Sequence, residues 1–339
     1  MNTTPTLSTV LPTADSTSEE IASFVVGAAV NAPSVLNTQP WWFYGADHEI
    51  GLHADTEHRL PVADPDGREM LISCGAALFT ARVALRHLGL VPSVRVLPEP
   101  DLPALVAKIN WTGMVPAAGY EQDLFAAITR RHTHQGGFDD EALPAEIVRS
   151  ARDEATKEHA TLRILGDQAQ RNALAAVVEA GDYAVRHDGA RAREQARWSA
   201  APGSKRRDGV PASAYPARPD RIEPRFPARD YSRGHGWGLP PTEGSQHIRS
   251  AGVVAILTTE GDGPESWISA GQALQRVLLF LTSCGLSAAL HTQPLEVPQL
   301  REFTRTQFCP GAYSQMVLRF GATSQETVSV RRPVDDVLL

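Results

Sequence analysis

Hydrophobic and polar residues along this chain alternate between helical and strand-like patterns. Apolar residues at helical spacing predict helices over about residues 21–30, 66–87, 144–159, 167–187 and 267–284. Short β-branched or apolar runs predict strands over about residues 41–44, 50–53, 94–97, 105–111, 161–165, 253–259 and 313–320. Because the two kinds of element alternate along the whole chain, the pattern indicates an α/β or α+β fold.

Two of the predicted helices are similar to each other in sequence. Residues 73–90 read SCGAALFTARVALRHLGL and residues 269–286 read SAGQALQRVLLFLTSCGL, with 7 of 18 positions identical at a constant offset of 196. Shared helical composition explains some of these identities, but both segments keep an internal glycine, which costs roughly 1 kcal/mol relative to alanine. Gly75 and Gly271 therefore predict a close approach of two backbones, and the repeat predicts two homologous lobes in one chain.

Composition suggests how these lobes are arranged along the sequence. We expect a flexible tail at residues 1–17, a first lobe at 18–118, and a second lobe that begins at 119–200 and resumes at 246–339. Between its two parts lies an insertion at residues 201–245, and residues 201–241 hold eight prolines and five glycines. Such a stretch predicts a long loop, and loops of this length are typically functional lids or linkers.

The charge of the chain is unevenly distributed. The formal net charge is −7, with 42% hydrophobic and 21% charged residues, which indicates a globular protein and argues against a general nucleic-acid binder. Residues 186–233, here called the basic segment, carry 12 Lys or Arg and 6 Asp or Glu. Their net charge of +6 opposes about −13 in the remainder. The basic segment is either a solvated linker or a basic lid over an anionic ligand.

Several protein classes are not expected from the sequence. The three cysteines are far apart and never form a C-x-x-C pair, which argues against a disulfide scaffold or a zinc ribbon. No uninterrupted run of about 18 apolar residues and no signal-peptide pattern occur, so we expect a soluble cytoplasmic protein without membrane contact.

Two stretches carry candidate binding chemistry. Residues 32–41, APSVLNTQPW, place small polar side chains and backbone amides between two prolines, as in a strip lining a planar ring or in an ordinary helix-to-strand turn. Residues 130–138, RRHTHQGGF, combine cations, a hydroxyl and flexible backbone, which suits either a phosphate site or a solvated basic turn. His132 and His134 could suit a metal, but no third ligand is visible nearby, so we expect no metal site.

These stretches resemble a known family. APSVLNTQPWWF resembles the A-P-S-x-x-N-x-Q-P-W strip of the flavin-dependent nitroreductase superfamily, and ITRRHTHQGGFDDEALP resembles its phosphate segment. WISAGQALQRVLLFLTSCGL, followed by LRFG and RRPVDDVLL, resembles its central helix, last core strand and C-terminal arginine. The motif order, the repeated central helix and the EQARW…RRDGVPA stretch resemble the fused, single-chain Acg-type branch. The resemblance covers roughly residues 18–338.

The resemblance implies an α+β, nitroreductase-like fold in which two homologous lobes of one chain mimic the family's homodimer, with a long lid-like loop. It implies one flavin mononucleotide (FMN) between the lobes. The flavin ring edge is assigned to Pro33, Ser34 and Val35, and Asn37 holds the strip. Arg131, His132, Thr133 and His134 surround the phosphate, and Arg332 closes that site. Thr292 and Gln293 lie at the turn that places a backbone N–H at flavin N5.

The implied function is NAD(P)H-dependent reduction of an electron-poor small molecule, with hydride passing through flavin N5. The chain would act as a monomeric pseudo-dimer or as a homodimer. The alternatives are a non-catalytic protein that sequesters flavin under a closed lid, and a lobe pair that has lost flavin. No side chain in the sequence indicates an obligatory acid or base, which fits chemistry supplied by a cofactor.

The phosphate segment departs from the branch in one respect. Gln135, Gly136 and Gly137 stand where the branch usually has one or two further arginines. Each lost charge-assisted contact is worth roughly 1.5–3 kcal/mol, so FMN retention could be weakened. Three arginines of the basic segment could compensate, namely Arg206, Arg207 and Arg221.

Overall fold

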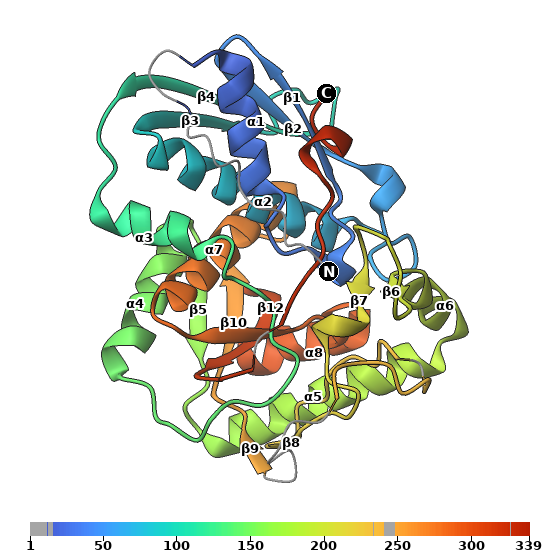
Figure 1. The fold of residues 1–339 in the computed structure, drawn as a ribbon. Coiled ribbons are helices and arrows are strands. Elements are labelled where there is room, and N and C mark those ends of the chain that lie inside the picture. Colours follow the sequence, from blue (N-terminus) through green and yellow to red (C-terminus); the bar gives the residue numbers. More distant parts are fainter. Residues whose placement is uncertain (1–11, 13–15, 233, 241–247, 326) are drawn as a thin grey trace.

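The computed structural model describes residues 12, 16–232, 234–240, 248–325 and 327–339. Most of the predicted tail, residues 1–11 and 13–15, lies outside the described residues, as does the end of the insertion at residues 241–245. Two four-stranded antiparallel sheets occupy two halves of the molecule, and two long helices run between them (Figure 1). The fold is therefore α+β.

The first half follows the predicted order closely. Its elements are α1 (Ser18–Ala29), β1 (Trp41–Ala46), β2 (Glu49–Ala54), α2 (Arg68–His87), β3 (Leu90–Val96) and β4 (Leu105–Met114). The strand order in the sheet is β1-β2-β4-β3. The α1 helix begins where Thr17 accepts a hydrogen bond from the Glu20 N–H, while the Glu20 carboxylate accepts one from the Thr17 N–H.

The second half repeats this arrangement with insertions. After α3 (Gly119–Ala127), its elements are α4 (Ala145–Thr156), β5 (Thr161–Ile164), α5 (Gln168–His187), α6 (Gly189–Arg197), β10 (Val253–Thr259), α7 (Pro264–Ser283), β11 (Ser287–His291), α8 (Pro298–Phe308) and β12 (Tyr313–Gly321). The strand order is β11-β12-β10-β5. When α4, α7 and these four strands are matched in chain order to α1, α2 and β1–β4, the two sheets have the same topology.

The two long helices cross at the glycines that the sequence repeat singles out. A Cβ atom on Gly75 would lie 3.1 Å from the Cα of Gly271, and one on Gly271 would lie 2.9 Å from the Cα of Gly75. The predicted close approach of the backbones is thus confirmed. Because equivalent positions face each other across α2 and α7, the contact resembles the isologous interface of a two-fold dimer.

The stretch between α6 and β10 folds back onto the first half of the molecule. It contains the short strands β6 (Ser199–Ala200), β7 (Val210–Pro211), β8 (Arg221–Glu223) and β9 (Ile248–Ser250). Its Val210, Tyr215 and Tyr231 are buried in a hydrophobic cluster with Leu36 and Leu60 of the first half. Such burial does not fit a solvated linker.

The chain ends by crossing back to the first sheet. Beyond β12, the last residues run beside β1, where the Phe43 N–H donates to the Val337 carbonyl at 2.6 Å and the Leu339 N–H donates to the Phe43 carbonyl at 2.9 Å (Figure 1). Val337 is fully buried in the core of the first half. The C-terminal residues that follow the second sheet therefore pack against the sheet of the first half. Within the described ranges, no helix combines the length and apolar character needed to cross a membrane.

Candidate cofactor cavity

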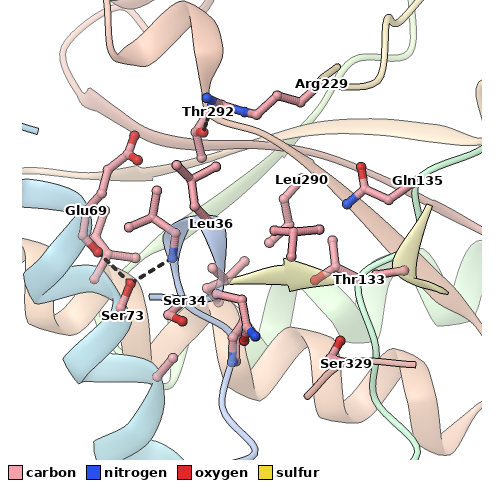
Figure 2. Close-up of a pocket in the computed structure, with 18 of the residues that line it drawn as sticks. Ser34, Leu36, Glu69, Ser73, Thr133, Gln135, Arg229, Leu290, Thr292 and Ser329 are labelled. Carbon is pink, nitrogen blue, oxygen red and sulfur yellow. Dashed lines mark hydrogen bonds between the residues drawn. The ribbon is translucent and has the colours of Figure 1, made fainter. Parts of the chain in front are cut away.

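A cavity lies where the two halves and the basic segment meet (Figure 2). About 960 Å³ within it is free of protein atoms, including its opening to solvent. The lining residues that concern the site are Pro33, Ser34, Val35, Asn37, Glu69, Ser73, Arg131, Thr133, Gln135, Arg229, Tyr231, Thr292, Ser329 and Arg331.

The strip at residues 33–37 reaches the cavity through an unusual backbone turn. Leu36 and Asn37 have φ values of 46° and 53°, in the left-handed region that side chains with a Cβ rarely adopt. Two hydroxyl groups hold the turn: Ser73 Oγ accepts from the Val35 N–H at 3.2 Å, and Ser34 Oγ accepts from the Gln39 N–H at 2.9 Å. Because these contacts fix the strip, its small side chains form one rigid wall of the cavity.

Asn37 joins this strip to two distant segments. Its amide nitrogen donates to the carbonyls of Gly209 at 2.8 Å and Val330 at 3.1 Å. Its amide oxygen accepts from Arg331 Nη1 at 2.9 Å. The side chain thus fastens the basic segment and the C-terminal segment to the strip.

Two buried arginines, Arg131 and Arg331, concentrate positive charge at the cavity. Each donates to the same Asn31 carbonyl at 3.2 Å. Within the described part of the chain, Nε and Nη1 of Arg131 and Nε of Arg331 have no hydrogen-bond partner. Burial lowers the pKa of Arg131 to about 10, and burial together with the charge of Arg131 lowers that of Arg331 to about 9. This pair of guanidinium groups is suited to an anionic ligand.

The hydroxyl groups of Thr133 and Ser329 line the same cavity (Figure 2). The neighbouring His132 is not among the lining residues. Burial and the charges of Arg131 and Arg331 lower the pKa of His132 to about 3, so its ring is neutral. His134 is buried, and its Nε2 lies 2.9 Å from the Gly137 carbonyl oxygen. Neither histidine faces the ligand space directly.

The C-terminal arginine at the cavity is Arg331, whereas the sequence reasoning selected Arg332. Arg332 instead approaches Asp55, with Nη1 3.3 Å from Oδ2, and donates from Nη2 to the Asp336 carbonyl at 2.9 Å. Neighbouring side chains on an extended backbone point in opposite directions, so only one of the pair can face the cavity. Thr292 lines the cavity, but the adjacent Gln293 is buried outside its lining.

The positions where the branch usually carries arginines are occupied by tightly packed backbone. The Gly137 N–H donates to Asp220 Oδ2 at 3.0 Å. A Cβ on Gly136 would lie 2.5 Å from that same oxygen. A side chain at Gly136 would therefore require the Asp220 carboxylate to move from its hydrogen bond with the Gly137 N–H. Gln135 does line the cavity.

The basic segment contributes a different arginine from those expected to compensate. Arg206, Arg207 and Arg221 are not among the lining residues, and Arg206 Nε is 2.8 Å from Asp208 Oδ1. Arg229 does line the cavity. Its guanidinium forms a buried ion pair with Glu296 and donates from Nη2 to Thr292 Oγ1 at 2.7 Å.

Glu69 and Arg229 were both missed by the sequence reasoning. Glu69 lies at the start of α2, in the residues preceding the repeat that drew attention to this helix. Arg229 is one of 12 basic residues in its segment, and no spacing distinguishes it. Among the described residues, no group of three or more His, Cys, Asp or Glu is arranged to hold a metal ion.

Curated relatives place the chain in a family. It is 32% identical over 303 residues to “Putative NAD(P)H nitroreductase Rv3131” of Mycobacterium tuberculosis strain H37Rv, an alignment that spans 89% of this chain and 85% of that protein. It is 27% identical over 322 residues to “Putative NAD(P)H nitroreductase acg” of the same strain, spanning 94% and 95%. The chain belongs to the nitroreductase superfamily, in its Acg-type branch.

Solved structures are less similar in sequence to this Acg-type protein than the two mycobacterial relatives are. A nitroreductase with bound FMN from Desulfitobacterium hafniense has a TM-score of 0.39 and 15% identity, covering 63% of this chain and 95% of that chain. Iodotyrosine deiodinase bound to FMN and 3-iodo-L-tyrosine has a TM-score of 0.38 and 17% identity, covering 62% and 94%. No family model matches the Acg-type chain.

Proposed function

We propose that this Acg-type protein binds one FMN in the cavity between its two halves. The observation that carries the proposal is the pair of buried guanidinium groups, Arg131 and Arg331, whose unpartnered N–H groups call for an anion. A phosphate monoester supplies negative charge and several acceptor oxygens, so it fits these donors. Thr133 and Ser329 add hydroxyl groups beside them.

The remaining cavity wall suits the flavin ring. Pro33, Ser34 and Val35 form a rigid strip on one side, and apolar side chains of both long helices, Ile72 and Leu274, line the cavity as well. A ring system with apolar faces and a hydrogen-bonding edge fits such a mixed lining. The roles proposed for His132, His134 and Arg332 are reduced to supporting the segments that carry Arg131 and Arg331.

We further propose that one chain takes the place of a homodimer. Support comes from the equal topology of the two sheets and from the glycine contact between α2 and α7. In that arrangement one lobe supplies the strip and the other lobe supplies the phosphate segment. A single chain therefore completes the site.

The activity proposed is NAD(P)H-dependent reduction of an electron-poor small molecule. It is supported by the names of the two mycobacterial relatives and by the family to which the chain belongs. Bound flavin supplies hydride transfer, and the chain's own residues bind the cofactor, orient it and exclude water.

A second candidate function is flavin sequestration beneath the basic segment. The observation that favours it is the burial of that segment where it meets the cavity: Tyr231 and Arg229 are each about 8% exposed, and Arg229 is fastened to Glu296. A segment held in this way would restrict access of an acceptor. Steady oxidation of NAD(P)H with a nitroaromatic acceptor would exclude sequestration as the main function.

The cofactor proposal is tested by titrating purified protein with FMN and following flavin fluorescence and absorbance. Arg331→Ala removes a charge-assisted contact worth roughly 1.5–3 kcal/mol, so we expect FMN affinity to fall about 10- to 150-fold. Arg332→Ala is the matched control, because its side chain contacts Asp55 outside the cavity. A wild-type protein that binds no FMN overturns the proposal, and a larger effect of Arg332→Ala overturns the assignment of Arg331.

A further inference from the structure

One buried carboxyl group in the cavity wall lacks a partner on one of its oxygens. Glu69 is 3% exposed, and its Oε1 accepts a hydrogen bond from Arg68 Nη2 at 2.8 Å. Within the described ranges, its Oε2 has no hydrogen-bond partner. Figure 2 shows the side chain extending from α2 toward the side of Thr292, away from Ser73. A buried oxygen left unpaired at a ligand cavity points to a function there.

The charged groups that act on Glu69 come from three parts of the chain. Arg68 is the first residue of α2 and Asp64 precedes that helix, Glu296 follows the turn at Thr292, and Arg229 comes from the basic segment. Burial and the charge of Glu296 raise the pKa of Glu69 well above its usual range, and the two arginines offset only part of this. Burial and the neighbouring negative charge therefore favour the protonated form of Glu69.

The second carboxyl group of the cluster behaves in the opposite way. Although burial opposes ionisation of Glu296, its ion pair with Arg229 lowers its pKa. It also accepts a hydrogen bond from Thr292 Oγ1 at 2.7 Å. Environments that shift the pKa values of two neighbouring carboxyl groups in opposite directions are typical of catalytic sites. In such sites one group donates a proton and the other stays ionised.

The hydrogen bond from Arg68 decides where the Glu69 proton lies. Because Oε1 accepts from Nη2, the protonated form of Glu69 would carry its proton on Oε2, the oxygen without a protein partner among the described residues. A carboxylic acid in that position can donate to a ligand in the cavity. After donation, the carboxylate that remains is already paired with Arg68, which limits the energetic cost of leaving a buried charge.

We propose that Glu69 is the proton donor of this cavity, supplying the proton that the acceptor takes up when it is reduced. The inference rests on the proposed oxidoreductase function. NAD(P)H provides the electron pair as hydride, and the acceptor gains that hydride at one atom of an unsaturated bond and the Glu69 proton at the other. NAD(P)⁺ and the Glu69 carboxylate remain, and the carboxylate regains a proton from water.

The protonation state is tested without any cofactor, by infrared difference spectroscopy of wild-type protein against Glu69→Gln at pH 7. We expect the wild type to show the C=O band of a protonated carboxylic acid that the variant lacks. Glu154→Gln is the matched control, because Glu154 is equally buried but forms an ion pair with Arg276 away from the cavity. Absence of the Glu69 band overturns the inference.

The donor role is tested by pH–rate profiles of acceptor reduction in FMN-loaded protein. We expect the wild-type rate to fall as pH rises through the pKa of Glu69, and Glu69→Gln to be slower by roughly 100-fold and to lack that fall. Glu69→Asp, which keeps an acid, should restore the pH dependence in part. Unchanged profiles in Glu69→Gln overturn the donor role. Failure of wild-type protein to bind FMN overturns the proposed function instead, and the infrared result distinguishes the two.

Discussion

The crossing of α2 and α7 joins the two halves of the molecule. The importance of this contact for stability can be tested by adding a single Cβ atom at the crossing. In the substitution Gly271→Ala, the new Cβ would clash first with the carbonyl oxygen of Ile72, and it would lie 2.8 Å from the Ile72 carbonyl carbon and 2.9 Å from the Cα of Gly75. Non-bonded carbons prefer about 3.5–4.0 Å, so the carbon contacts alone would require the helices to separate by roughly 0.7 Å, and the oxygen contact requires more. All three contacts are backbone atoms, which cannot move aside as a side chain could.

The expected cost follows from two opposing effects. Overpacking of a tight core costs roughly 1–3 kcal/mol, and a backbone clash belongs at the upper end of that range. Alanine in a helix gains about 1 kcal/mol over glycine, which offsets part of it. We therefore expect the free energy of unfolding of Gly271→Ala to fall by about 2 kcal/mol, measured by urea denaturation.

Gly27→Ala is the matched control for this substitution. Gly27 also lies inside a helix, but a Cβ there would meet only Val334 Cγ2 at an ordinary 3.5 Å. Without a clash, the helical preference of alanine should leave the protein as stable or slightly more stable. If Gly271→Ala unfolds at the same urea concentration as Gly27→Ala, the reasoning about the helix crossing is refuted.

Two ion-pair clusters give further predictions. Contacts with Asp208 and Asp55 raise the pKa of His58 from about 6.5 to about 9, so its stabilising contribution is complete below pH 6.5 and is lost as pH rises through 9. Unfolding free energies of wild type and His58→Gln should converge across that window, and a constant difference would contradict the assignment. Arg229→Met leaves the buried Glu296 without its counter-charge and should destabilise the protein by about 3–5 kcal/mol. Adding Glu296→Gln should recover much of that loss in calorimetry, and simple additivity of the two effects would count against the pair.

Most of the longer regular elements could be predicted because local patterns specify them, but α3, α6, α8 and β11 were not predicted. The glycine-terminated repeat locates both long helices within a few residues, and Gly75 and Gly271 indicate their contact from the sequence alone. What the sequence could not show was the path of the irregular stretches. The burial of Tyr231 against Leu36 depends on residues almost 200 positions apart, and no local periodicity encodes such a contact.

The candidate site was predictable to the extent that its motifs are contiguous. The strip at residues 33–37 lies at the cavity, as do Arg131, Thr133 and Thr292. The choice between Arg331 and Arg332 depends on which of the two side chains faces the cavity. Because both residues are arginines, the sequence does not distinguish them. Glu69 was missed because its significance lies in an unpaired oxygen, which is a property of the packing around it.

The uneven charge of the chain takes on a more precise meaning in three dimensions. The net charge of +6 in the basic segment does not create the positive centre at the cavity, because Arg131 and Arg331 both lie outside residues 186–233. These two side chains, 200 residues apart, converge on one carbonyl, that of Asn31. Like charges so placed repel each other, so the C-terminal segment holds Arg331 beside Arg131 against this repulsion, which a bound anion would relieve. Ligand binding and the association of the two halves should therefore be linked. A phosphate-bearing ligand would relieve the repulsion between the two arginines, and it would stabilise the folded chain more the more tightly it binds.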